Sequence, residues 1–279
     1  MIVTISDTHL GTDHLGPRYN NREDVKAFLR YLRDDLRPDH LVLNGDIEDL
    51  WRRNVRTLTR ENYDVFQLFR ELQDRGVAVH YVLGNHDWYA RKDVFRGRLS
   101  YYTEDYAEML TLTDAGTRYT FVHGHQFDPI QDEWYFDKLA LISDDAFGAR
   151  FSHFWEVLSE LEGLPDAVAT AKRLVVDRIT KGPWQQRIER MDRCQTGCDA
   201  AAELHESHDY AESMLVTDVL CTGHTHVPGI TADGRAANSG AWVGQQRTFL
   251  EIDDGLRLLE WNDGDPYELG EDQIEVYPG

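Results

Sequence analysis

The sequence has few cysteines and no long apolar run. The cysteines, Cys194, Cys198 and Cys221, are too few and too scattered for a disulfide framework or a four-cysteine zinc site. Cys194 and Cys198 lie four positions apart, so a redox pair stays open, but we expect ordinary reduced thiols. No stretch approaches the roughly 18 apolar residues of a membrane span, and no basic leader precedes the strand-like residues 1–5. We therefore expect a cytoplasmic protein, with peripheral membrane contact left open.

Positive charge is also scarce, and lysine in particular. The 279 residues carry 50 acids against 29 bases, of which 24 are Arg and 5 are Lys, and the net charge is −21. This balance disfavours nonspecific nucleic-acid binding, and it indicates a halophilic protein from a high-salt cytosol where counterions screen self-repulsion. Many of the bases lie in residues 52–60, 91–98 and 172–193, as solvated helix faces or as parts of an anion-binding surface. The sequence gives no sign of an oligomeric state.

What the chain does contain is a repeated pattern of strand followed by polar cluster. The β-prone runs cover residues 2–5, 41–43, 77–83, 119–122 and 219–221, and the clusters that follow read "SDTHLG", "NGDIEDL", "GNHDWY", "HGHQFD" and "TGHTHVPG". Helical patterns lie between the early runs, at 21–36, which opens on Asn-x-Glu-Asp, and at 62–75, which ends at Gly76. Such alternation predicts an α/β fold with a largely parallel sheet. The clusters would then meet at one rim, beyond the carboxyl ends of the strands.

A second region interrupts this pattern. Amphipathic helical stretches follow one another from about residue 129 to 214, and strand patterns return at 247–252 and 256–261. We expect an α/β core formed by residues 1–128 and 215–279, with residues 129–214 inserted as a helical cap. With 41% hydrophobic residues, the chain can bury a sizeable core.

The clusters supply a set of metal-binding side chains. These are Asp7, His9, Asp46, Asn85, His123, His224 and His226. Any one of these histidines, taken alone, is more often an ordinary buried or exposed residue. Together, imidazole nitrogens, carboxylate oxygens and an amide oxygen suit borderline divalent metals, most of all Mn²⁺, with Fe²⁺, Zn²⁺ or Co²⁺ as alternatives. Seven ligands exceed what one ion takes, so we expect two ions that share a carboxylate.

The five clusters, in this order over residues 6–226, resemble the calcineurin-like metallophosphoesterase family. The resemblance is nearest to its UDP-2,3-diacylglucosamine pyrophosphatase-like branch, through "GDIEDLW", "HGHQFD" and the helical insertion. It implies a four-layer αββα sandwich with a helical cap. It also implies that Asp7, His9 and His226 hold one metal ion. Asn85, His123 and His224 would hold the other, with Asp46 between the two.

The resemblance further implies a reaction. In the family, the second Asp of Gly-Asp-x-x-Asp pairs with the His of Gly-Asn-His, which here gives the catalytic pair Asp49 and His86. Two metal ions neutralise the phosphate oxygens and lower the pKa of a bridging water, whose hydroxide attacks phosphorus. His86, kept protonated by Asp49, would give its proton to the leaving oxygen. Glu48 has no assigned role, and we expect it to be solvated.

The substrate is less well defined than the reaction. This chain has His86 where the lipid pyrophosphatase has Arg, and His125 where it typically has Asp, so the lipid substrate does not carry over. We expect hydrolysis of a phosphodiester or pyrophosphate bond in an anionic nucleotide-linked or lipid-linked substrate. The predicted substrate contacts are Arg52, Arg53, Arg91, Lys172, Arg173 and His125. The alternatives are a phosphomonoesterase, a DNA nuclease, and a binding scaffold with a degraded metal site, although here every ligand position is filled.

Overall fold

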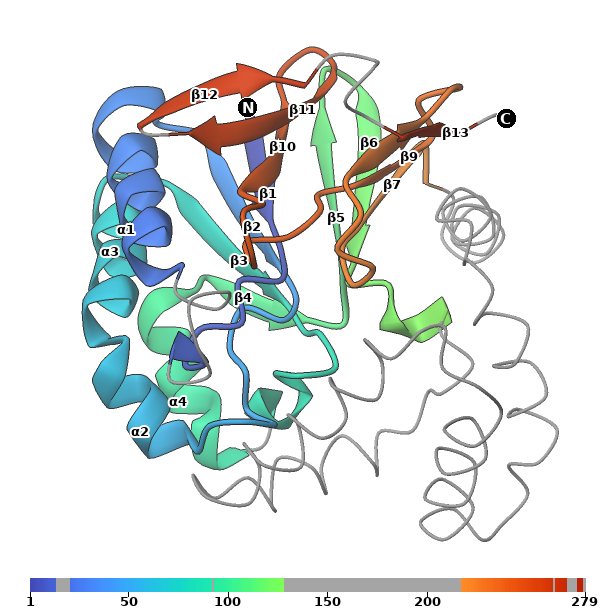
Figure 1. The fold of residues 1–279 in the computed structure, drawn as a ribbon. Helices are drawn as coiled ribbons and strands as arrows, with labels where there is room; N and C mark the ends of the chain where they lie inside the picture. Colours follow the sequence, from blue (N-terminus) through green and yellow to red (C-terminus); the bar gives the residue numbers. More distant parts are fainter. Residues whose placement is uncertain (14–20, 92, 128–216, 263, 270–274, 278–279) are drawn as a thin grey trace, which may run out of the picture.

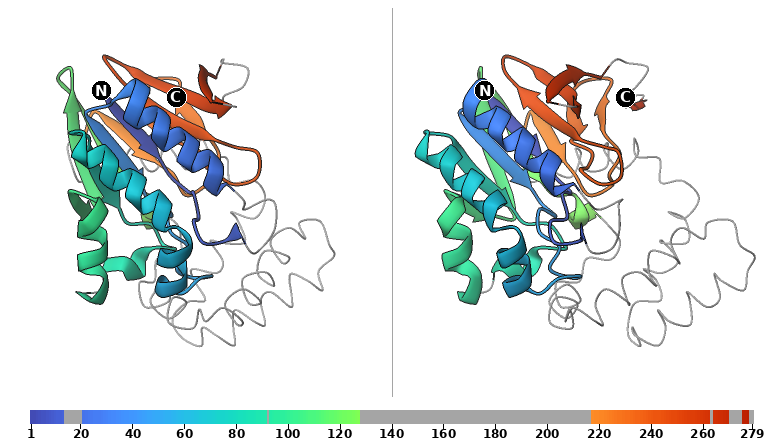
Figure 2. Two further views of the ribbon diagram at one scale, coloured as in Figure 1. Left: turned by 90° about the vertical axis from the view of Figure 1, so that its left-hand side faces the viewer. Right: turned by 60° about the vertical axis from the view of Figure 1, so that its left-hand side comes forward.

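The computed structural model describes residues 1–13, 21–91, 93–127, 217–262, 264–269 and 275–277. The cap predicted over residues 129–214 lies outside these residues, as do Cys194 and Cys198. Two β-sheets face each other, and the α-helices that the structure describes cover the outer side of one of them (Figures 1 and 2). The predicted α/β sandwich with two sheets is thereby confirmed.

The larger sheet has seven strands, in the order β12-β11-β10-β1-β2-β3-β4. Its parallel half comprises β1 (Ile2–Ile5), β2 (His40–Asn44), β3 (Ala78–Val82) and β4 (Asp105–Ala107). Its antiparallel half comprises β10 (Thr248–Ile252), β11 (Leu256–Asn262) and β12 (Asp265–Glu268). The sheet is therefore less parallel than the sequence predicts.

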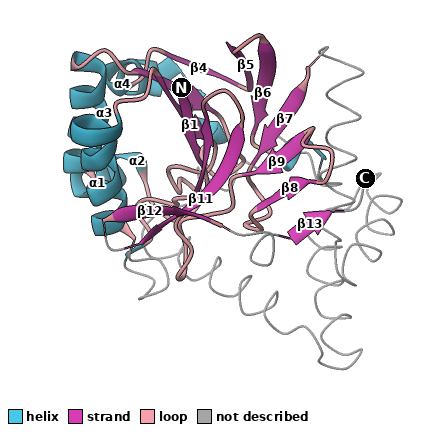
Figure 3. Ribbon diagram, turned by 90° about the horizontal axis from the view of Figure 1, so that it is seen from above, coloured by secondary structure: helices cyan, strands magenta, loops and turns pink. Residues whose placement is uncertain are grey.

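The smaller sheet has six strands, in the order β13-β8-β9-β7-β6-β5 (Figure 3). These are β5 (Met109–Asp114), β6 (Thr117–Val122), β7 (Val219–Thr222), β8 (Gly229–Thr231), β9 (Ala236–Asn238) and β13 (Glu275–Tyr277). The strands β6 and β7 run parallel, although the chain between them includes the whole predicted cap. The five strand runs predicted from the sequence thus belong to two sheets, three to the larger and two to the smaller.

The helices connect the parallel strands of the larger sheet. They are α1 (Arg22–Tyr31), continued by a π-helical turn (Leu32–Leu36), α2 (Val55–Glu61), α3 (Tyr63–Asp74) and α4 (Asp93–Tyr102). The helix predicted over 62–75 is confirmed, and Gly76 follows it with a φ of +92°. The first predicted helix begins as expected, but the side chain of Asn21 does not cap it. That amide instead donates hydrogen bonds to the carbonyls of Thr8 and Trp242.

Two apolar layers hold these parts together. Along β1, Val3 and Ile5 face the helices, whereas Ile2 faces the smaller sheet, as the two-residue repeat of a strand requires. The layer between the sheets includes Phe121 and Cys221, both fully buried. Cys221 is a free thiol, as predicted, and burial raises its pKa. No described helix is long and apolar enough to cross a membrane.

Candidate metal centre

The predicted ligands meet where the carboxyl ends of five strands come together. Backbone hydrogen bonds join the loop after β1 to the loop after β2, from Asp7 N to Gly45 O at 3.0 Å and from His9 N to Asp46 O at 2.9 Å. The loops after β6 and β7 are joined from Gly223 N to His123 O at 2.8 Å. Across the two sheets, His224 N donates to Oδ2 of Asp7 at 3.0 Å. The two sheets therefore present their polar loops to a common rim, which agrees with the prediction of a single rim.

The first group of ligand atoms comes from Asp7, His9 and His226. In this group Nε2 of His226 lies 3.1 Å from Oδ1 of Asp7, and the two histidine Nε2 atoms lie 3.3 Å apart. The second group comes from Asp46, His123 and His224, in which Nε2 of His123 lies 3.2 Å from Oδ2 of Asp46. In each group the ligand atoms lie within 4.8 Å of one another, so each can hold one divalent ion.

Asp46, a member of the second group, also approaches the first. Its Oδ2 lies 3.2 Å from Nε2 of His123 in one group and 4.0 Å from Nε2 of His9 in the other. Its side chain is 3% exposed, so the carboxylate has lost nearly all contact with water. This is the geometry expected for the shared carboxylate.

Several buried ligand atoms make no hydrogen bond within the described residues. They are Asp7 Oδ1, Asn85 Oδ1 and His123 Nε2. A buried polar atom that makes no hydrogen bond is costly and calls for a missing ion or water. His123 Nε2 and Asp46 Oδ2 are also close without being aligned for a hydrogen bond, as expected when both face a common point. The residues present therefore fit a divalent metal.

The backbone of these loops adopts an unusual conformation. Five of the predicted ligands have positive φ, from 45° at His9 to 70° at His224. The others are Asp7 and Asp46, both at 52°, and His226 at 60°. Non-glycine residues seldom occupy this region, and its cost is tolerated mainly at functional sites. Nothing in the local sequence indicates this feature.

Two glycines make room for the ligands. A Cβ atom at Gly45 would lie 2.3 Å from Nδ1 of His123, and one at Gly84 would lie 2.2 Å from Oδ1 of Asp46. Real Cβ atoms do not come this close to other atoms. The glycines of "NGDIEDL" and "GNHD" therefore permit close packing against the two ligands.

Asn44, at the end of β2, supports the centre and was not predicted. Its backbone carbonyl lies 3.0 Å from Nδ1 of His123, which makes Nδ1 the protonated nitrogen and leaves Nε2 for a metal. Its side-chain amide donates to Val122 O at 3.1 Å and to Cys221 O at 3.3 Å. Asn44 therefore joins the two sheets beside the ligands. Its position at the end of an apolar strand run was the only available signal.

The ionisable groups of the centre shift one another's pKa. Burial opposes ionisation of Asp7, but His226 and His123 lower its pKa to about 2. Burial likewise opposes ionisation of Asp46, but His123 and His86 hold its pKa well below the usual range. For His123, burial lowers the pKa, but Asp46 and Asp7 raise it to about 10. Without metal, the centre is thus an ionic cluster in which a proton occupies a ligand position.

The predicted pair His86 and Asp49 is in contact. Nδ1 of His86 lies 3.1 Å from Oδ1 of Asp49, and Nε2 lies 4.0 Å from Oδ2 of Asp46. Burial opposes ionisation of Asp49, but Arg52 and His86 hold its pKa well below the usual range. The ring therefore lies between an anion and the metal centre, as a proton donor there requires. His9, Asp46 and His86 also form a third possible ligand group, so His86 has a competing role as a metal ligand.

One expectation was wrong. Glu48 is fully buried rather than solvated. Its carboxylate accepts hydrogen bonds from Nη1 of Arg98, at 2.6 and 2.7 Å, and from the hydroxyl of Tyr102. Glu48 can be buried because Arg98 on α4, about fifty residues away in the sequence, offsets the cost of burying the acid.

The predicted substrate contacts that the structure describes have different surroundings. Nη1 of Arg52 lies 2.8 Å from Asp49, and Arg53 donates to Glu61 at 3.0 Å. Arg91 lies over the ring of Trp88, 4.7 Å from its centroid. His125 is 5% exposed, and its ring centroid lies 5.5 Å from that of His123. Lys172 and Arg173 lie outside the described residues.

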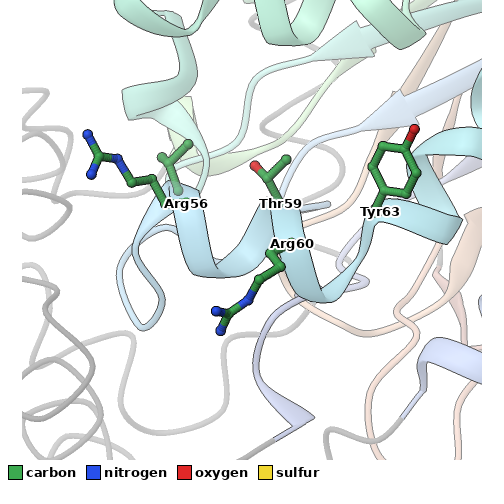
Figure 4. A pocket seen from close by; sticks show the side chains of 5 residues that line it. Arg56, Thr59, Arg60 and Tyr63 are labelled. Atoms are coloured by element: carbon green, nitrogen blue, oxygen red, sulfur yellow. The ribbon is translucent and has the colours of Figure 1, made fainter.

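The other two arginines among residues 52–60 are exposed. Arg56 and Arg60 line a shallow pocket with Val55, Thr59 and Tyr63, along α2 and the start of α3. Their guanidinium groups point away from each other (Figure 4). The pocket contains none of the predicted metal ligands. Of the four arginines in residues 52–60, two form ion pairs within the protein and two are exposed.

Comparison with known proteins adds one decisive match. Residues 1–228 match the family model described as calcineurin-like phosphoesterase. No curated protein matches the chain. Similar solved structures include YfcE, a phosphoesterase from E. coli, at 16% identity and a TM-score of 0.44 over 96% of this chain and 97% of that one. They also include Vps29 from Entamoeba histolytica complexed with zinc, at 15% identity and a TM-score of 0.42 over 96% of this chain and 96% of that one.

A dimetal phosphatase from Danio rerio is similar at 15% identity and a TM-score of 0.43, over 93% of this chain and 94% of that one. At these levels the structural likenesses support no further conclusion. The family match does, because it extends from the first ligand cluster to the last.

Proposed function

This chain belongs to the calcineurin-like phosphoesterase family and is a metal-dependent phosphoesterase, and we propose that it cleaves a phosphodiester or pyrophosphate bond with two divalent metal ions. The observation that carries this proposal is the presence of two neighbouring groups of ligand atoms, one from Asp7, His9 and His226 and one from Asp46, His123 and His224, with Asp46 close to both. A single metal ion would use the ligand atoms of only one of these groups.

The ligands divide as their positions suggest. By the family resemblance, Asp7, His9 and His226 would hold one ion, and Asn85, His123 and His224 the other, with Asp46 shared between them. In support, Asp7 lies with His9 and His226, and Asp46 lies with His123 and His224. Mn²⁺ is the ion we expect, because nitrogen and oxygen ligands in this mixture suit it. When bound, the two ions neutralise a phosphate group and activate a water for attack on phosphorus.

His86 and Asp49 would act on the leaving group. Nε2 of His86 lies 4.0 Å from Oδ2 of Asp46, and Nδ1, at the other side of the ring, lies 3.1 Å from Oδ1 of Asp49. A protonated His86 can therefore donate to the oxygen that leaves phosphorus. Asp49 also lies 3.2 Å from Nδ1 of His9, so one carboxylate orients both the acid and a ligand.

For the substrate, we propose a nucleotide-linked or lipid-linked phosphate ester or anhydride. The chain has the motif "GDIEDLW", which resembles the UDP-2,3-diacylglucosamine pyrophosphatase-like branch, and residues 129–214 would form the helical cap between two parts of the core, 1–128 and 215–279. His86 and His125 differ from that branch, so the acylated sugar nucleotide itself is not proposed.

The test compares substrates with metal-free and metal-loaded protein. The chain is stripped with chelator and reloaded with Mn²⁺, and bis(p-nitrophenyl) phosphate, p-nitrophenyl phosphate, nucleotide diphosphate conjugates and single-stranded DNA are assayed. We expect a diester or pyrophosphate to be hydrolysed only with metal, and titration calorimetry to give two ions per chain. Asp46→Asn should weaken the binding of both ions. Binding of a single ion, or preference for the monoester, would contradict the proposal.

A further inference from the structure

The contacts at Nδ1 and Nε2 of His86 do not define the plane of its imidazole ring. Its Nδ1 is near Asp49 at 3.1 Å, but this nitrogen is not aligned for a hydrogen bond. Its Nε2 lies 4.0 Å from Asp46, beyond hydrogen-bond distance. Attraction by two carboxylates fixes where the ring lies, but it does not fix the plane of the ring. A proton donor needs that plane defined, because transfer depends on the direction of the N–H bond.

Trp51 supplies a flat surface against this ring. The centroids of Trp51 and His86 are 3.9 Å apart, and the planes make an angle of 25°, which is a stacked arrangement. His9 approaches His86 edge-on, with centroids 4.7 Å apart and an angle of 88°. Stacking keeps the imidazole plane close to that of the indole, whereas an edge contact restrains the plane less.

The loop that carries Trp51 is itself anchored to the chain around His86. Leu50 N, next to Trp51, donates to the carbonyl of His86 at 3.2 Å. On the other side, Arg52 N donates to Oδ1 of Asp49 at 3.1 Å. The tryptophan backbone is therefore fixed relative to both members of the acid pair, and its ring packs against the apolar core.

We propose that Trp51 is a positioning residue that holds the His86 imidazole in the plane from which Nε2 donates to the leaving oxygen. This proposal rests on the proposed function, in which His86 is the proton donor. In this proposal Trp51 acts through His86, on which its ring is stacked. Nothing in composition or periodicity marked this residue, which the sequence shows only as the end of "GDIEDLW".

The experiment uses two phosphodiesters that differ in leaving group, bis(p-nitrophenyl) phosphate and diphenyl phosphate, with Mn²⁺-loaded full-length protein. The phenolate of the second leaves poorly and needs a proton donor, whereas p-nitrophenolate needs little help. We expect Trp51→Ala to lower kcat for diphenyl phosphate about 10- to 100-fold and to change kcat for the nitrophenyl ester far less. Trp51→Phe, which keeps a flat ring, should restore most of the loss.

Three controls separate positioning from general damage. Tyr101→Ala removes an aromatic ring that is 45% exposed and should leave both rates unchanged. The Mn²⁺ affinity of Trp51→Ala should match the wild type, whereas its melting temperature should fall, because the ring packs against the apolar core. If Trp51→Ala does not fold, Trp51→Leu, which fills much of the space without a flat ring, gives the same test.

A double-mutant cycle decides how Trp51 acts. In a His86→Ala background, Trp51→Ala should cause no further loss, because the group that it positions is gone. If His86→Ala hydrolyses both esters like the wild type, the proton-donor role of His86 is wrong, and this proposal falls with it. If His86→Ala slows only diphenyl phosphate while Trp51→Ala slows both esters equally, or slows the His86→Ala protein further, the role of Trp51 alone is wrong.

Discussion

At the scale of single residues, the space around the Asp46 carboxylate leaves no room for an additional carbon atom. A Cβ at Gly84 would lie 2.2 Å from Oδ1 of Asp46 and 2.5 Å from its backbone nitrogen. We therefore expect Gly84→Ala to displace Asp46 and to weaken Mn²⁺ binding about 10- to 100-fold, the range seen when support for a ligand is lost. Isothermal calorimetry on metal-stripped protein measures this directly.

Gly97 provides the matched control, because a Cβ there would meet nothing within 4 Å. It lies inside α4, where alanine is a better helix former by about 1 kcal/mol, so Gly97→Ala should raise stability and leave metal binding unchanged. Equal metal affinities in the two variants would show that the close approach at Gly84 has no consequence for the centre.

The proton on His123 predicts how metal binding depends on pH. Burial lowers its pKa, but Asp46 and Asp7 raise it to about 10 in the metal-free chain, so a metal ion must displace a proton below that pH. Mn²⁺ affinity should therefore rise with pH, and calorimetry in buffers of different ionisation enthalpy should detect the released proton.

The stability of the metal-free protein should change in the opposite direction. A raised histidine pKa stabilises the fold fully below about pH 6.5, the value for an unfolded chain, and this stabilisation is lost as pH rises through about 10. His123→Gln should abolish both effects. Mn²⁺ binding without proton release at neutral pH would show that His123 is already neutral.

Single residues also show where sequence reasoning ends. The identity of the seven candidate ligands followed from their place after strand runs, and the structure groups six of them, all but Asn85, within 4.8 Å of their neighbours. The left-handed backbone of Asp7, His9 and Asp46 could not be predicted, because nothing local favours it over an ordinary turn. The burial of Glu48 could not be predicted either, because it depends on Arg98, a partner that lies on another element.

At the scale of elements, that buried pair connects α4 to the loop after β2. Arg98 is 14% exposed and Glu48 is fully buried, and Tyr102 on the same helix also donates to the carboxylate. Removing the cation leaves a buried unpaired charge, so we expect Arg98→Ala to lower the free energy of unfolding by about 3–5 kcal/mol, measured by urea denaturation. Arg98→Met combined with Glu48→Gln should cost much less, because no charge is then stranded. Equal losses would mean that helix packing, and not the charge pair, connects the two elements.

The elements that could be predicted are those that are buried and long. The strand β1 and the helix α3 match their predicted ranges closely because their apolar spacing is complete. The strands β4, β8 and β9 are three residues each, too short to show any period. The edge strand β5 has no fully buried residue, and only Leu110 and Leu112 on its inner face are apolar, too few to mark a strand. Pairing of β1 with β10 joins residues about 250 positions apart, which no local pattern records.

At the scale of the whole molecule, the charge of −21 acts against folding, because like charges repel more in the compact state. In molar salt the screening length falls to about 3 Å, and repulsion between exposed acids is then largely removed. We therefore expect the melting temperature to rise steadily from low salt to molar KCl. The expectation requires that the repulsion come from the surface, since buried pairs such as Glu48 and Arg98 are screened little.

A charge-reduced variant tests this cause. Glu108, Asp265 and Glu268 are exposed, and each can be replaced by Lys without disturbing the metal centre. The triple variant should melt at a higher temperature than the wild type in low salt, and the gap should close as KCl is added. Differential scanning calorimetry at several KCl concentrations, on metal-stripped protein, keeps salt effects separate from metal binding. A melting temperature of the wild type that fails to rise with molar salt would show that the acidic surface does not govern stability. The Asp-rich, Lys-poor composition would then carry no information about the salinity in which the protein works.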